Sequence, residues 1–179
     1  MPLDIALGIF LSLATAHVFG IDAGAGLIMF GILCALLPDI DMLPFLSRIS
    51  YDHRSFFHWP LLYVPLAIMA WLLFGALYAT LFSLCILAHF VHDSIGIGWG
   101  VAWLAPFSMR KILFPEKGRR GEYGFFMTWL PEEEAAMAAK WHDPQWIKHW
   151  YCRMRLLTLI EYAAFALSIL LLFVYYRAL

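Results

Sequence analysis

The longest apolar stretch of the chain covers residues 59–91 and contains no Asp, Glu, Lys or Arg. As one straight helix, this stretch would measure about 50 Å at 1.5 Å per residue. The hydrocarbon core of a bilayer is only about 30 Å thick. The stretch must therefore fold back, and Gly75 within residues 74–78 is the best position for the hinge.

Three further apolar runs, residues 5–20, 27–37 and 156–176, flank this stretch. Hydrophobic residues make up 63% of the 179 positions and charged residues 14%, whereas soluble domains are about half apolar. We therefore expect an all-α, polytopic transmembrane helical bundle of about five spans, forming a single membrane domain over residues 1–179. Residues 5–16 imitate a signal peptide, but Asp4 stands where a basic residue should precede them, so we expect a retained first span.

Basic residues predict the sidedness of this bundle. Of the twelve Lys and Arg residues, Arg48 and Arg54 lie after the second run, and nine lie within residues 110–155. The positive-inside rule places both loops in the cytoplasm. Five spans with a cytoplasmic N-terminus satisfy this arrangement.

Residues 109–155 form a cytoplasmic or interfacial segment that is first basic and then amphipathic. Pro131 followed by three glutamates predicts a helix start, since acids suit the positive end of a helix dipole. Further on, Trp146, Trp150 and Met154 recur every four residues, which predicts an interfacial helix before the last span. The basic string at residues 110–120 is expected to attract anionic lipid headgroups.

Acidic and imidazole side chains gather at the ends of the apolar runs, where a membrane protein would place them only with a partner. The predicted topology brings seven of them to the inner boundary. They are Asp4, Asp39, Asp41, His53, His58, His89 and Asp93. A bound divalent metal would compensate such a set, with zinc the best match, manganese or magnesium as alternatives, and one to three ions in number.

Each of these groups also has a simpler interpretation. His89 and Asp93, four residues apart on one helix face, would serve equally in a hydrogen bond between helices. Asp39 and Asp41 would equally end a helix as solvated acids, and a loop histidine needs no role. The metal hypothesis is favoured because three separate segments would otherwise place acids and imidazoles on one rim by chance.

Four motifs in a fixed order carry a family resemblance: LLPDID, HRxxxH, HxxxD and a glycine-rich turn ending in LAPFS. Together they resemble the YdjM-like family of bacterial inner-membrane proteins, described as metal-dependent hydrolases and grouped with zinc-dependent phospholipases C. The similarity covers residues 4–108. It implies a location in the bacterial inner membrane and Arg54 as a phosphate contact. The metal ligands that it implies are Asp39, Asp41, His53, His58, His89 and Asp93.

The sequence departs from the family pattern beside these motifs. The family usually has a His four residues before an N-terminal Gly, and this chain has Asp4 there. The position after PDID, often His, is Met42. The Gly, Thr and Ser around HRxxxH are replaced by Ser55, Phe57 and Trp59.

The resulting expectation is a metal-dependent phosphoesterase acting at the cytoplasmic face on a phospholipid or lipid-linked phosphate, with Asp39, Asp41 and Arg54 as the catalytic residues. The alternative is a non-catalytic membrane scaffold or partner-binding protein with at most a structural metal. A small ion or proton carrier ranks last, because the span centres are mostly apolar.

Other chemistries find no support in the sequence. There is no GxSxG motif, and Cys34, Cys85 and Cys152 are isolated, with neither a disulfide framework nor zinc-finger spacing. The basic string at residues 110–120 is too short to predict nucleic-acid binding.

Overall fold

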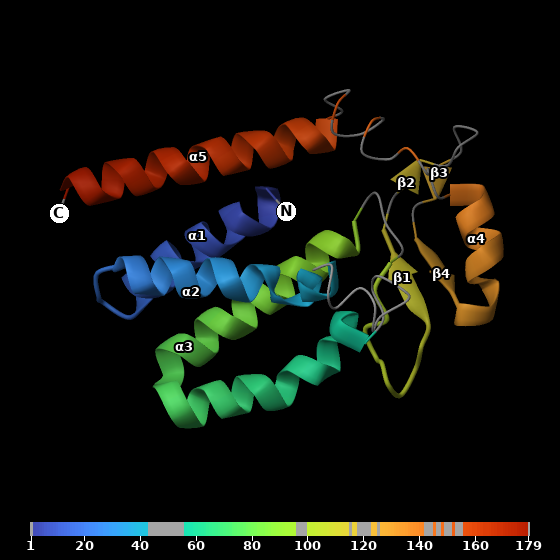
Figure 1. Cartoon of the computed structure of the whole chain (residues 1–179), viewed down its shortest axis with the longest axis horizontal. Helices are drawn as coiled ribbons and strands as arrows, with labels where there is room; N and C mark the ends of the chain where they lie inside the picture. The colour runs from blue at the N-terminus through green and yellow to red at the C-terminus, as the bar shows by residue number, and fades with distance from the viewer. Residues whose placement is uncertain are drawn as a thin grey trace. The chain divides into compact units, whose positions relative to one another are not determined.

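The computed structural model describes residues 2–42, 56–95, 100–114, 116–117, 123–124, 126–141, 145, 148, 152 and 156–178. This described part of the chain is mainly helical (Figure 1). Its longer helices are α1 (Pro2–Val18), α2 (Ala25–Leu36), α3 (Tyr63–Asp93) and α5 (Leu156–Ala178). Its shorter ones are η1 (Leu37–Met42), η2 (Phe56–His58), η3 (Pro60–Leu62), η4 (Pro131–Glu133) and α4 (Glu134–Trp141).

The chain forms two compact units. The first, here the helical unit, comprises Met1–Pro38, Pro65–His89 and Arg155–Leu179. The second, here the strand-containing unit, comprises Asp39–Val64 and Phe90–Met154. Helix α3 contributes residues to both units. The single domain over residues 1–179 stays a prediction.

Helices α1 and α2 of the helical unit approach closely at two glycines. A Cβ atom on Gly8 would lie 2.7 Å from Cα of Ile32, and one on Gly31 would lie 2.7 Å from the carbonyl oxygen of Gly8. Between them, Ser12 Oγ donates a 2.7 Å hydrogen bond to the Gly8 carbonyl and lies 3.2 Å from the Leu27 carbonyl oxygen. Small residues thus let two helix backbones touch, which is a common packing mode in membrane bundles.

The predicted hinge in the long apolar stretch is confirmed. Gly75 has φ 83° and ψ −178°, a conformation that breaks α3 into two helical halves. The left-handed φ is costly for any residue with a Cβ atom and cheap for glycine. Figure 1 shows α3 turning back on itself.

The C-terminal end of α5 is fixed to the turn between α1 and α2. The backbone N–H of Ala23 donates to the Tyr175 hydroxyl over 2.7 Å, and the Tyr176 hydroxyl donates to the Ala23 carbonyl over 2.9 Å. Two neighbouring tyrosines therefore satisfy both backbone groups of one turn residue, and they hold α5 beside α1.

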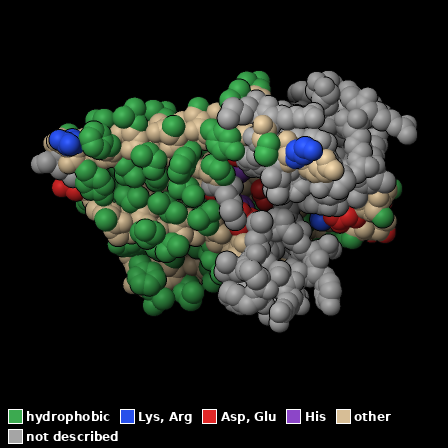
Figure 2. Space-filling model, turned by 45° about the horizontal axis from the view of Figure 1, so that its top comes forward, with side chains coloured by type: hydrophobic (Ala, Val, Ile, Leu, Met, Phe, Trp, Pro, Cys, Tyr) green, Lys and Arg blue, Asp and Glu red, His purple; other side chains and the backbone are tan. Residues whose placement is uncertain are grey.

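Among the described residues, two helical segments are long and apolar enough to cross a membrane, Pro60–Asp93 and Leu156–Ala178. Only 22% and 17% of their most apolar windows are buried within the described chain, whereas the core helix of a soluble protein would be mostly buried. Figure 2 shows the corresponding hydrophobic surface over the helices. Helices α1 and α2 are apolar but shorter, so the count of five spans stays a prediction.

Short strands in the strand-containing unit correct the all-α expectation. Strand β1 (Lys111–Leu113) pairs antiparallel with β4 (Met127–Trp129), and β2 (Glu116–Lys117) pairs with β3 (Tyr123–Gly124). Residues 111–113 and 127–129 alternate buried and half-buried positions, and Leu113, Met127 and Trp129 form a small core. These strands carry no clear signal in the sequence, because three-residue strands are too short for a periodic pattern.

The helix start predicted at Pro131 is confirmed. Pro131 opens η4, and α4 follows from Glu134. The Glu133 carboxylate accepts a 2.8 Å hydrogen bond from the Leu130 N–H, which satisfies a backbone donor ahead of the helix. The predicted interfacial helix at Trp146, Trp150 and Met154 lies outside the described residues.

A partly buried ion pair joins β1 to the first residue of α4. Lys111 Nζ lies 2.6 Å from Glu134 Oε1, and Lys111 is buried. We expect Glu134→Gln to lower the free energy of unfolding by about 1–3 kcal/mol, because a charge-assisted hydrogen bond is lost and a buried ammonium remains. Urea unfolding followed by Trp fluorescence measures this change. The exposed neighbour variant Glu132→Gln should change stability by less than about 0.5 kcal/mol; equal effects would contradict the prediction.

Candidate metal site

The first carboxylate of the site comes from the turn that ends α2. Helix α2 ends at Leu36, and Pro38 sits in the short helix η1, which carries Asp39. Proline has no N–H to continue the α-helical hydrogen-bond pattern, so the regular helix gives way to the short 3₁₀ segment that carries the acid.

The first imidazole comes from η2 and is held by aromatic neighbours. His58 is only 1% exposed and its ring meets that of Phe90 edge to face, with 6.2 Å between ring centroids. Phe90 also packs against Tyr63, whose hydroxyl donates a 2.8 Å hydrogen bond to the Phe57 carbonyl. This packing fixes the histidine in a buried position, where its nitrogens must meet polar groups.

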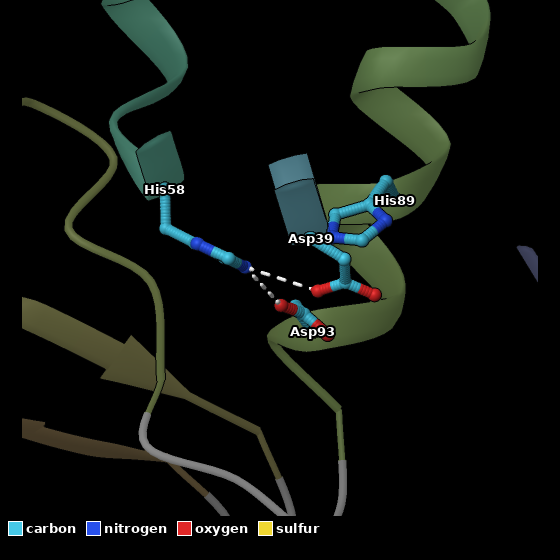
Figure 3. A group of neighbouring side chains, drawn as sticks. All are labelled: Asp39, His58, His89 and Asp93. Atoms are coloured by element: carbon cyan, nitrogen blue, oxygen red, sulfur yellow. Dashed lines mark ion pairs between the residues drawn. The ribbon is translucent and has the colours of Figure 1, made fainter. Parts of the chain in front are cut away.

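His58 faces two carboxylates at once. Its Nε2 lies 3.5 Å from Asp39 Oδ1 and 3.3 Å from Asp93 Oδ2, and Figure 3 shows both carboxylates pointing toward the ring. These separations exceed the usual 2.7–3.2 Å range of an N–H···O hydrogen bond. They are close to the roughly 3.4 Å between neighbouring ligand atoms around one tetrahedral zinc with bonds near 2.1 Å.

His89 lies one helical turn before Asp93 on α3. Its Nδ1 lies 2.8 Å from the Ala35 carbonyl oxygen and 3.3 Å from Asp4 Oδ1. A carbonyl oxygen only accepts, so Nδ1 must carry the hydrogen, and in the neutral ring Nε2 then presents its lone pair. A metal-ligating histidine is commonly oriented in this way by a carbonyl or carboxylate behind it.

Asp39, His58, His89 and Asp93 together fit a single metal ion. Each offers one ligand atom, and these atoms all lie within 4.8 Å of one another. His58, His89 and Asp93 are buried, and Asp39 is half-buried. Two imidazoles and two carboxylates make a donor set that suits zinc, and a buried position without a cation would leave two carboxylates close together.

The seven predicted ligands divide into three groups. Asp39, His58, His89 and Asp93 converge as described above. Asp4, 1% exposed, lies against His89 at Nδ1, so it supports the imidazole from behind and is not a member of the converging group. Asp41 lies in η1, but its side chain is outside the described part, as are His53 and the predicted phosphate contact Arg54. The role of these three stays a prediction.

Sequence reasoning missed the backbone carbonyl of Ala35 and the ring of Phe90. Ala35 fixes the His89 tautomer, and Phe90 supports His58. A carbonyl group leaves no trace in the side-chain pattern, and one phenylalanine in a long apolar run carries no distinguishing signal. Only the fold reveals both contributions.

Comparison with known families finds a match. The family described as YdjM inner membrane protein matches residues 4–178, nearly the whole chain. The chain belongs to this YdjM family. The resemblance noted in the motifs is thereby confirmed at the level of the family. Among curated proteins and solved structures, nothing matches the chain.

Membership of the YdjM family supports a location in the inner membrane, as its description says. The apolar segments Pro60–Asp93 and Leu156–Ala178 agree with this location. In this YdjM protein the residues that converge come from η1, η2 and α3, which carry PDID, the second His of HRxxxH, and HxxxD. Residues of three separate motifs thus share one location in space.

Proposed function

We propose that this YdjM-family protein is a membrane-embedded, metal-dependent phosphoesterase that acts on a phospholipid or lipid-linked phosphate at the cytoplasmic face. The observation that supports the proposal best is the geometry at His58, whose Nε2 faces Asp39 at 3.5 Å and Asp93 at 3.3 Å. Ligand spacing around one cation accounts for both distances. Two separate hydrogen bonds would be shorter.

The converging residues hold the ion in this proposal. Asp39, His58 and Asp93 supply three ligand atoms, and His89 supplies Nε2 while the Ala35 carbonyl and Asp4 fix its tautomer. A divalent cation in such a site supplies positive charge for a phosphate ester and lowers the pKa of water toward neutrality. Zinc is the proposed metal because two of the four donors are imidazoles.

The proposed topology has about five spans with the N-terminus in the cytoplasm. Its support is the confirmed hinge at Gly75, which makes two antiparallel halves of α3, and the concentration of Lys and Arg in two loops. This arrangement puts the end of α3, with His89 and Asp93, at the cytoplasmic face. Phosphate headgroups of the inner leaflet would then lie at the same level as the site.

The experiment compares metal content and hydrolysis in matched carboxylate variants. The purified protein in nanodiscs is expected to contain bound zinc, and to hydrolyse bis(p-nitrophenyl) phosphate or a fluorescent phosphatidylglycerol. Asp39→Ala should lose both properties, whereas Asp22→Ala, at an exposed turn position outside the cluster, should retain them. Elemental analysis and product release measure the two properties separately.

The two measurements separate the competing functions. Bound zinc without turnover of either substrate would overturn the proposed phosphoesterase activity. It would support the alternative function, a membrane scaffold with a structural metal. Absence of any metal in protein purified without chelators would overturn both the proposed metal site and the proposed hydrolysis. Hydrolysis that survives both chelation and Asp39→Ala would mean that the activity arises elsewhere.

A further inference from the structure

Two large apolar side chains project from one turn of the strand-containing unit. Phe107 is 88% exposed and Leu104 is 62% exposed. Neither belongs to a helix that could span a membrane. Exposure of this degree on neighbouring residues is unfavourable in water, since each such side chain gains about 1.5–3 kcal/mol on full burial.

The turn that carries them is firmly built. Ala105 N–H donates to the Ala102 carbonyl and Ser108 N–H donates to the Leu104 carbonyl, both over 3.0 Å. Ala102 and Ala105 are buried beneath the turn. These hydrogen bonds fix the backbone of the turn whose Leu104 and Phe107 side chains are exposed.

The same turn is tied to the end of α3. Trp103, the residue before Leu104, donates from Nε1 to Ser94 Oγ over 3.0 Å, and its ring packs against Phe90. Ser94 directly follows the last residue of α3. The part of α3 after Gly75 is about 27 Å long at 1.5 Å per residue, which is close to the thickness of the hydrocarbon core. If this half crosses the membrane, the turn lies at a membrane surface.

A basic residue follows the apolar pair. Arg110 lies three residues after Phe107 and is exposed, and its Nη1 donates to Thr128 Oγ1 on β4 over 3.2 Å. Apolar side chains that enter the acyl boundary with a cation beside them are typical of interfacial anchors on anionic membranes. The charge therefore distinguishes an anionic lipid surface from a purely apolar protein partner.

We infer that the turn at residues 104–107 is an interfacial anchor, which inserts Leu104 and Phe107 into the acyl boundary of an anionic bilayer while Arg110 contacts lipid phosphate. The anchor is tied through Trp103, Ser94 and Phe90 to the end of α3 that carries Asp93. It requires that the half of α3 after Gly75 crosses the membrane, and it does not depend on the proposed reaction.

The test measures the depth of a spin label on the turn. Cys152→Ser removes the exposed native cysteine, while Cys34 and Cys85 are buried and should not react. In this background, Phe107→Cys carries a nitroxide label in the full chain, reconstituted into phosphatidylglycerol nanodiscs. We expect collisions with oxygen to exceed those with a water-soluble nickel chelate. A label at Glu132→Cys, exposed in η4, should give the reverse order.

The lipid composition tests the role of Arg110. In phosphatidylcholine nanodiscs the Phe107 label is expected to lie shallower than in phosphatidylglycerol, and Arg110→Gln should remove this difference. A Phe107 label as accessible to nickel as the Glu132 label would overturn the anchor. A Phe107 label shielded from both oxygen and the nickel chelate would show that another protein, such as a second copy of this chain, covers the turn. A label at equal depth in phosphatidylglycerol and phosphatidylcholine would overturn the preference of the anchor for anionic lipid. Any spin label that reacts with Cys34 or Cys85 would be detected in the Cys152→Ser protein that carries no introduced cysteine, which serves as the control.

Discussion

His58→Ala is expected to lower the zinc affinity of the purified protein by at least about 100-fold, which is the upper end of what loss of a supporting neighbour costs. His58 is the imidazole that meets both Asp39 and Asp93, at 3.5 and 3.3 Å. Without this imidazole the carboxylates of Asp39 and Asp93 lose their common neighbour, and the metal loses one of its four ligands. Phosphodiester hydrolysis should fall with the bound zinc.

The matched control is another histidine close to the cluster. His92 directly precedes Asp93 on α3 but is outside the converging group, so His92→Ala should keep both zinc and activity. Added zinc should raise the midpoint of thermal unfolding for the wild type and His92→Ala, because a ligand that binds the folded state stabilises it. His58→Ala should show no such rise. A zinc-dependent rise in His58→Ala would exclude this histidine as a ligand.

Gly31→Ala is expected to destabilise the helical unit by about 3 kcal/mol or more, which exceeds the usual cost of an added methylene in a core. The new Cβ atom would overlap Ser12 Oγ and lie 2.7 Å from the Gly8 carbonyl oxygen. Both groups belong to the hydrogen bond that Ser12 Oγ donates to the Gly8 carbonyl within α1. Because the Gly8 carbonyl is part of the helix backbone, it cannot move aside cheaply.

Gly26→Ala provides the control in the same helix. Nothing lies within 4 Å of a Cβ atom at Gly26, and alanine has a helix propensity up to about 1 kcal/mol better than that of glycine. This variant should be as stable as the wild type or slightly more stable. Thermal unfolding in detergent, followed by circular dichroism, compares the two variants. Equal midpoints would show that α1 and α2 do not approach as closely as described.

Backbone features with a strong local cause could be predicted from the sequence. An apolar run too long for one span required a break, and glycine is the residue that can adopt φ 83° at low cost, so Gly75 was identified. Pro131 with the glutamates after it similarly identified the start of η4 and α4. The strands could not be predicted, because each has only two or three residues and the pairing joins residues 111–113 to residues 127–129, which are distant in the sequence.

The candidate site was partly predictable for a different reason. Asp39, His58, His89 and Asp93 stand out because acids and imidazoles are costly beside apolar spans, whatever the fold. Their spacing showed that His89 and Asp93 share a helix face. It could not show that Asp4 lies behind His89 while the other carboxylates lie around His58.

The sequence by itself therefore determined the class of protein, the hinge in α3 and the residue types available for a metal, because composition and helix periodicity act locally. The tertiary structure alone decided which carboxylate meets which imidazole. It also decided that the Ala35 carbonyl fixes the tautomer of His89. These contacts depend on how α1, α2 and α3 pack, and packing is set by side-chain shape across distant segments, which no local pattern records.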